Sequence, residues 1–134
     1  MTNRSQVLDA VIAAYEQAAV AGGISPTSVA VYRDTAFAEV DLPAANLMRG
    51  GDAPDGAVGS STGKATLRLS IALYAKGSTR FDVVDRVEEG IRAALATGMP
   101  HPVNSISMAT EWDSDELVDA YAAAKISLII DYIQ

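Results

Sequence analysis

Residues 59–63 read Gly-Ser-Ser-Thr-Gly and match G-x-S-x-G, the pattern in which some hydrolases expose a nucleophilic serine. Asp82 or Asp85, followed by His101, would supply the acid and the base in Ser–Asp–His order. That chemistry needs a sharp turn from a strand into a helix. Here a glycine-rich stretch precedes Ser61 and a strand-like pattern follows it, so the order of elements is reversed. We therefore interpret the pattern as a flexible linker and expect no catalytic residue.

The end of this stretch also approaches a phosphate-binding loop, because Gly63 precedes Lys64. Such a loop, G-x-x-x-x-G-K-[ST], would need glycine at position 58 and serine or threonine at position 65. Those positions hold Val58 and Ala65. The loop would also need a helix directly after the lysine, because the helix N-terminus helps to bind the phosphate. The pattern there is that of a strand, so we exclude a phosphate-binding loop.

Metal and cofactor chemistry has little support in the sequence. His101 is the only histidine and the chain has no cysteine, so a transition-metal site would need mostly carboxylate ligands. One acidic cluster offers carboxylates for calcium but lacks the D-x-[DN]-x-[DN]-G pattern of an EF-hand: Glu111, Asp113, Asp115, Glu116 and Asp119. We expect no metal and no cofactor. We interpret the cluster as a solvated surface or, alternatively, as a subunit contact.

The chain of 134 residues is acidic, with 17 acidic and 10 basic residues and a net charge of −7. An acidic surface repels the phosphates of nucleic acids, so we expect no specific nucleic-acid binding. DNA that passes nearby without binding is compatible with this charge. The apolar runs are much shorter than the ~20 residues of a membrane-spanning helix, so we expect no membrane association.

The elements that hold these residues are clearest between residues 63 and 100. The first half alternates with period two, which predicts a half-buried strand with one apolar face: Leu67, Leu69, Ile71 and Leu73. After Lys76 the period becomes that of a helix with one apolar stripe: Phe81, Val84, Val87, Ile91 and Leu95. Thr79 is the expected N-cap of this helix. Because strand and helix both need cover, we expect the helix to pack on the sheet.

The other elements are predicted in the same way. Residues 5–21 form a helix that ends at two glycines and has an apolar face of Leu8, Val11, Ile12 and Tyr15, extended by Ala18 and Ala19. A short strand is expected at 29–33, and 40–48 is extended, with Pro43 at a sheet edge or a bulge. The glycine-rich residues 49–63 are expected to form a mobile loop. Two more strands are expected, at 105–112 and 122–134, and the second has one apolar face: Ile126, Leu128, Ile130 and Tyr132.

This order of elements predicts an α+β fold. We expect a single domain over residues 1–134, in which two helices pack on one face of a mainly antiparallel sheet. The last strand also has apolar residues on its second face, Ile129 and Ile133. Such a strand needs cover on both faces, from helices or from a neighbouring subunit.

Several short segments follow the N-terminal helix in a fixed order along nearly the whole chain. They are Leu42-Pro43-Ala44-Ala45-Asn46-Leu47, Gly50-Gly51-Asp52, Thr66-Leu67-Arg68-Leu69-Ser70-Ile71, Ala75-Lys76-Gly77, Phe81-Asp82-Val83-Val84, Thr110-Glu111-Trp112 and the closing Ala124-Lys125-Ile126-Ser127-Leu128-Ile129-Ile130-Asp131-Tyr132. This order, together with the length, resembles the tail terminator proteins of long-tailed bacteriophages, also called minor tail protein U. The family has no catalytic signature, so the resemblance rests on order and length.

The resemblance implies a non-enzymatic virion assembly protein. Members of this family form a six-membered ring on the head-proximal end of the tail tube, stop its growth and offer the surface that joins the head. The implied partners are further copies of the chain, the tail tube protein and the head–tail connector protein, with DNA passing through the ring. The implied location is the head-proximal end of the virion tail, and assembly occurs in the host cytoplasm. Two alternatives stay open: a head–tail connector or neck-joining protein, and a small-molecule-binding or enzymatic α+β domain.

The expected interface residues follow from the ring. A ring contact is heterologous, so one surface meets a different surface on the next copy. The family places its long loop against the tube, which implies a role for Arg49, Asp52 and Asp55. We expect charges of opposite sign to fix the register between copies. The basic set is Lys64, Arg68, Lys76 and Arg80, the acidic set is Asp113, Asp115, Glu116 and Asp119, and the apolar residues are Ile129 and Ile133.

Overall fold

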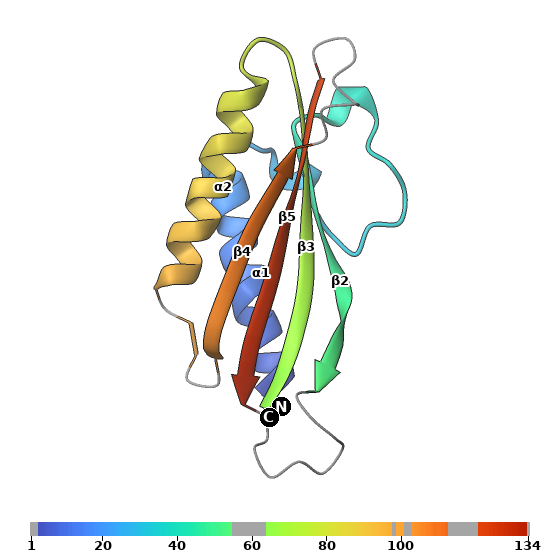
Figure 1. Ribbon diagram of the computed structural model, residues 1–134. Coiled ribbons are helices and arrows are strands. Elements are labelled where there is room, and N and C mark those ends of the chain that lie inside the picture. Colours follow the sequence, from blue (N-terminus) through green and yellow to red (C-terminus); the bar gives the residue numbers. More distant parts are fainter. Residues whose placement is uncertain (1–2, 55–63, 98, 101–102, 113–120, 134) are drawn as a thin grey trace.

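A twisted β-sheet carries two helices on one of its faces (Figure 1). The computed structural model describes residues 3–54, 64–97, 99–100, 103–112 and 121–133. In these ranges the helices and strands are α1 (Asn3–Ala21), β1 (Val29–Val31), β2 (Ala44–Pro54), β3 (Lys64–Lys76), α2 (Arg80–Ala96), β4 (Val103–Trp112) and β5 (Tyr121–Ile133). Two short 3₁₀ turns lie at Pro26–Ser28 and Glu39–Asp41. The expected α+β class is confirmed.

The sheet has five strands in the order β1-β2-β3-β5-β4. The short β1 pairs with β2 in parallel, and all other neighbours are antiparallel. The two longest strands, β3 and β5, form the centre and pair along their whole length, from Lys64 opposite Ile133 to Lys76 opposite Tyr121. The last strand of the chain therefore lies between β3 and β4.

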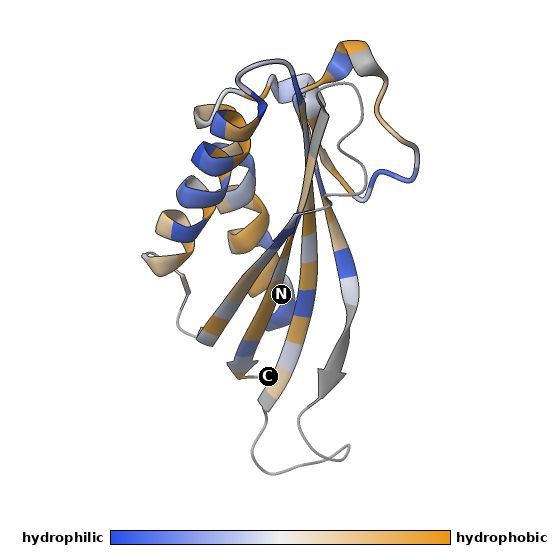
Figure 2. Ribbon diagram, turned by 45° about the horizontal axis from the view of Figure 1, so that its top comes forward, coloured by the Kyte–Doolittle hydropathy of each residue, from blue (hydrophilic) through white to orange (hydrophobic). Residues whose placement is uncertain are grey.

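The core fills the space between the sheet and the helices. The predicted apolar faces of both central strands are buried there: Leu67, Leu69, Ile71 and Leu73 on β3, and Ile126, Leu128, Ile130 and Tyr132 on β5. Figure 2 shows the underlying alternation as successive apolar and polar bands along these strands. Period-two alternation therefore identified both central strands and their buried faces correctly.

The apolar stripe of α2 is shorter than its sequence pattern indicates. Val84, Val87, Ile91 and Leu95 are buried, as predicted. Phe81 was expected on the same stripe, but its side chain is 40% exposed and its ring packs against Trp112 instead. Thr79 occupies the N-cap position, yet its side chain makes no capping hydrogen bond, and its backbone carbonyl accepts from the Val83 amide.

The apolar face of α1 is rotated relative to the prediction. The buried residues are Val7, Val11, Ala14, Tyr15, Ala18 and Ala19, whereas Leu8 and Ile12 are only partly buried. The Tyr15 hydroxyl donates a hydrogen bond of 2.7 Å to the carbonyl oxygen of Ala30 and so ties α1 to β1. Burial raises the pKa of this hydroxyl above its usual range.

The helices approach each other through small residues. A Cβ atom at Gly90 would lie 3.3 Å from the Cβ of Ala18, and a Cβ at Gly22 would lie 2.5 Å from Cγ2 of Val87. Gly23, with φ of 108°, takes the left-handed conformation that ends α1 as predicted.

Two predicted boundaries between β1 and β3 are wrong. The glycine-rich loop was expected from Arg49, but Arg49 to Pro54 belong to β2 and pair with β3. A bulge between Arg49 and Gly51 accommodates the glycines within the strand. Pro43, expected at an edge or a bulge of a strand, lies just before β2 in a cis peptide bond with Leu42. The rest of the predicted mobile loop, 55–63, lies outside the described residues.

β1 ends earlier than expected. The predicted strand reached Arg33, but β1 stops at Val31 because Tyr32 takes a positive φ of 60°. Few residues other than glycine adopt this conformation, and it turns the chain out of the sheet.

Candidate assembly surface

One face of the sheet carries no α-helix from the part of the chain that the structure describes. We call it the open face; it is the side opposite α1 and α2, which pack on β3 and β5 (Figure 1). The pairing registers bring its residues into rows that cross four strands. From β2 to β4 the rows are Met48-Ser70-Ser127-Ala109, Gly51-Arg68-Ile129-Ser107 and Ala53-Thr66-Asp131-Ser105.

One end of the open face is covered by the segment between β1 and β2. The side chain of Asn46 accepts a hydrogen bond of 3.1 Å from the Arg33 amide and donates one of 2.9 Å to the Arg33 carbonyl. The Phe37 ring lies 6.2 Å from the Tyr74 ring, and the guanidinium of Arg33 lies 4.2 Å from the Phe37 centroid. This segment therefore forms a fixed part of the surface.

Apolar side chains remain exposed on the rest of the open face. Ile129 is 41% exposed and Ile133 is 44% exposed, so the second apolar face of β5 carries no helix. Arg68 is exposed and is the register partner of Ile129 on β3. Exposed apolar residues next to a charged one are typical of a protein contact surface rather than of a catalytic pocket.

A carboxylate and two hydroxyls meet in the row next to Ile129. Thr66 Oγ1 donates to Asp131 Oδ1 at 2.9 Å, and Ser105 Oγ donates to Asp131 Oδ2 at 3.2 Å. The hydrogen bond to Asp131 does not by itself make either hydroxyl a nucleophile, because activation also requires a general base suited to that hydroxyl. These two hydrogen bonds link β3 and β4 to β5.

The hydrolase-like residues 59–63 and His101 lie outside the described residues.

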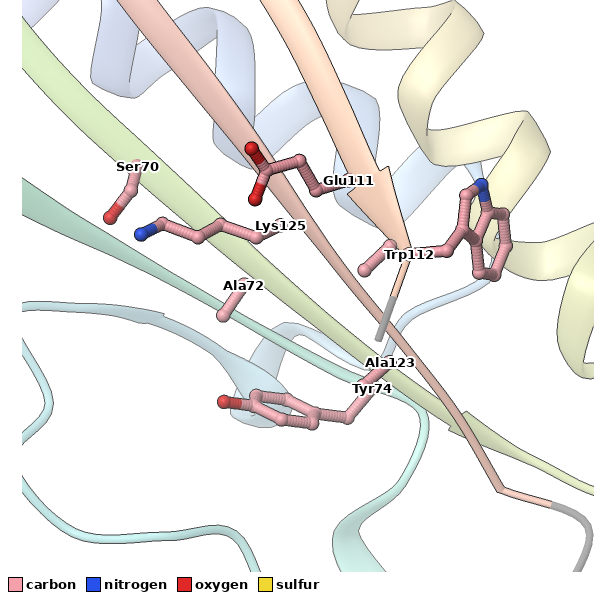
Figure 3. Close-up of a pocket in the computed structure, with 8 residues that line it drawn as sticks. Ser70, Ala72, Tyr74, Glu111, Trp112, Ala123 and Lys125 are labelled. Atoms are coloured by element: carbon pink, nitrogen blue, oxygen red, sulfur yellow. The ribbon is translucent and has the colours of Figure 1, made fainter. Parts of the chain in front are cut away.

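A shallow hollow of about 530 Å³ lies towards the end of the open face where β4 stops (Figure 3). Its lining residues are Ser70, Ala72, Tyr74, Glu111, Trp112, Ala123, Ala124 and Lys125. Glu111 and Lys125 are register partners, and Figure 3 shows both side chains on the same side of the sheet. The hollow presents charges of both signs, which suits a polar protein contact.

An aromatic group stands beside this hollow. The Phe81 and Trp112 ring centroids are 5.5 Å apart, and the Arg80 guanidinium lies 4.6 Å from the Phe81 centroid. Arg80 Nη1 also donates to the Gly77 carbonyl at 2.8 Å, which holds its side chain in place. Partly exposed tryptophan and arginine side chains often dominate the binding energy of interfaces. Arg80 belongs to the predicted interface set, but sequence periodicity assigned Phe81 to the core stripe and so missed the contact between Phe81 and Trp112.

The structure does not gather the predicted interface residues into one patch. Lys64 and Lys76 lie at opposite ends of β3, about 40 Å apart at ~3.3 Å per residue. Arg49 and Asp52 lie within β2 rather than in a loop. The remaining predicted residues lie outside the described ranges: Asp55, Asp113, Asp115, Glu116 and Asp119.

Within the described ranges, no group of three or more His, Cys, Asp or Glu residues is placed to hold a metal ion. No helix in those ranges is both long and apolar enough to cross a bilayer.

No protein-family model matches the sequence, and no curated protein matches it closely enough to count as a relative. The fold, however, matches a chain of a solved structure described as "Virion of native gene transfer agent (GTA) particle", with a TM-score of 0.58. The same fold occurs in a virion. The match covers 96% of this chain and 98% of that chain, at 14% sequence identity. At this identity the likeness establishes a shared fold over the full length of both chains.

Proposed function

We propose that this protein is a non-enzymatic structural protein of a phage-like virion. The main observation behind the proposal is the structural match with a chain of a gene transfer agent virion. The match covers 96% of this chain and 98% of the virion chain. A match of this extent spans nearly the whole fold rather than one common motif. The open face supports the same role, because it exposes the apolar side chain of Ile129 beside the charged side chain of Arg68, as protein contact surfaces do.

We propose further that the protein acts as a tail terminator. In this role six copies form a ring on the head-proximal end of the tail tube, stop its growth and provide the surface for head joining. Two points support it: the order of short segments, which resembles that family, and the unlike faces of the sheet, of which one carries α1 and α2 and the other is open. The closest competing role is that of a head–tail connector or neck protein.

The charged residues define a testable contact within this ring. We propose that Arg68, which is exposed on the open face, and the other basic residues near β3 face the acidic set 113–119 of the next copy. Reversing the four acidic residues of that set to lysine should prevent ring closure while the fold survives. High salt should shift wild-type rings towards monomers, because partly exposed charge pairs are screened. Light scattering at low and high salt measures both effects.

The experiment that separates the two roles combines the purified protein with polymerising tail tube protein and, separately, with isolated heads. A terminator caps tube ends and limits tube length in electron micrographs. A connector protein leaves tube length unchanged and binds to the head vertex. Bovine serum albumin at the same concentration is the control for non-specific crowding of the tube ends. Tubes of unlimited length, together with binding of the protein to heads, would contradict the terminator role and support the connector role.

A further inference from the structure

The sheet ends in two unlike edges that no further described strand covers. β4 pairs with β5 on one side only. β1 pairs only with Ala45 to Leu47 of β2, so from Met48 onwards no described strand lies on the outer side of β2. In Figure 1 these two edges lie on opposite sides of the sheet.

The edge of β4 has few of the features that protect a sheet from further pairing. Natural edge strands commonly carry lysine, proline or bulges that block a second chain. From Ser105 to Thr110, β4 has no charged residue and no proline, and its pairing with β5 is regular. Its irregularity lies earlier, between Val103 and Ser105. This stretch is therefore open to an additional strand.

The edge of β2 is suited to antiparallel pairing with the edge of β4 in another copy, because the two strands run in opposite directions and lie at the same level in the sheet. Three antiparallel pairings separate β2 from β4, so the two strands run in opposite directions. The rows of the open face place Met48 level with Ala109 and Ala53 level with Ser105. Two copies set side by side in the same orientation would thus present β4 of one to β2 of the next, antiparallel and at the same height.

We propose that the Ser105–Thr110 edge of β4 pairs with the Met48–Ala53 edge of β2 in a neighbouring copy. One continuous sheet then crosses each subunit boundary, and the open faces of successive copies join. The β2 edge carries the bulge between Arg49 and Gly51, so β2 has one more residue than β4 between the levels of Met48 and Ala53, and β4 of the next copy must pair around it. The contact joins different surfaces, so it generates a ring when the rotation closes and a filament when it does not. The closed form rests on the proposed ring function; the pairing itself does not.

Engineered disulfides test this pairing directly, because the chain contains no cysteine. Met48→Cys is combined in turn with Ser105→Cys, Ser107→Cys and Ala109→Cys, which cover three successive rows. A disulfide forms only when the Cα atoms approach to about 4.4–6.8 Å. We expect one of the three pairs to give a ladder of covalent oligomers on a non-reducing gel. The full-length protein is used both alone at high concentration and on tail tubes.

Two controls define the background. The single variants should stay monomeric on the gel, and Met48→Cys with Glu89→Cys should do the same because Glu89 is exposed on α2, away from the open face. Far-UV circular dichroism melts confirm that every variant is folded. Ladders that appear only with a β4 pair, in rings or in filaments, would support the pairing.

Three results would overturn the pairing. Closed rings in micrographs without a ladder from any pair would show that another surface forms the ring, and the proposed function would survive. Efficient dimers from Ser107→Cys alone would indicate a symmetric contact between two β4 edges. Monomers under every condition would contradict both the pairing and the ring. Ladders from open filaments without rings would uphold the pairing and contradict the terminator role.

Discussion

Gly22 lies directly against Val87, where the end of α1 meets α2. A Cβ atom at position 22 would be 2.5 Å from Cγ2 of Val87, closer than real Cβ contacts allow. We predict that Gly22→Ala lowers the free energy of unfolding by about 1–3 kcal/mol, the usual cost of an overpacked core. Urea denaturation of both proteins measures the difference.

The same contact predicts a specific coupling. Val87→Ala removes the atom that the new methyl group would strike, at the cost of a cavity. The double variant Gly22→Ala with Val87→Ala should therefore lose less stability than the sum of the two single variants. Losses that add within about 0.5 kcal/mol would show that the two residues do not interact in this way.

The buried and open faces of the sheet should differ sharply in their tolerance of charge. Leu69 and Ile91 are 2% and 1% exposed, so Leu69→Asp or Ile91→Asp buries an unpaired carboxylate. The cost reaches several kcal/mol, comparable to a whole stability of ~5–15 kcal/mol, and we expect both variants to be unfolded in thermal melts. Ile129→Asp on the open face is the matched control and should melt within a few degrees of wild type. A folded Leu69→Asp variant would mean that the helices do not cover β3.

Tyr15 should make stability depend on pH in the alkaline range. Burial holds the pKa of its hydroxyl above the ordinary value of about 10. As the pH rises above 10, the unfolded chain releases this proton before the folded chain does, so the stabilisation is present below pH 10 and declines above it. Tyr15→Phe removes the hydrogen bond to Ala30, and should cost about 0.5–1.5 kcal/mol at pH 7.

Comparison of the free energies of unfolding at pH 8 and pH 11 isolates the contribution of the Tyr15 hydroxyl. The stability difference between wild type and Tyr15→Phe should shrink as the pH rises, because only the wild type loses the contribution of this hydroxyl. Denaturant unfolding at a series of pH values measures it. A difference that stays constant across the range would show that the hydroxyl titrates as it does in water.

Sequence periodicity correctly predicted the strands that have one buried and one exposed face. Leu69 lies between Arg68 and Ser70, so the distinction between the buried and exposed faces of β3 follows from side-chain direction alone. Ile129 was placed on the opposite face by the same rule. These predictions are local, so they did not require knowledge of the strand order.

The predictions failed where contacts with a neighbouring strand or side chain determine the structure. Gly50 and Gly51 are typical of a loop, but the long β3 beside them provides a complete partner for β2 and a bulge absorbs the glycines. Phe81 fits the helical stripe, yet it lies in the first turn of α2, where Trp112 rather than the core is its neighbour. Residue patterns cannot show such partners.

The candidate surface was predictable only in part. Sequence reasoning found the exposed isoleucines of β5 but not the edges of the sheet, because an edge is defined by strand order. The insertion of β5 between β3 and β4 leaves β4 on the outside, although β5 follows it in the chain. The opposite directions of β2 and β4 likewise follow from three pairings that no local pattern contains.

Electron microscopy of tail tubes assembled with and without the purified protein tests the central proposal most directly. We expect closed six-membered rings at one end of each tube and a limited tube length when the protein is present. Ile129→Asp, which is expected to fold, tests in the same experiment whether the open face takes part. Tubes that keep growing in the presence of wild-type protein, with bare ends, would contradict the account.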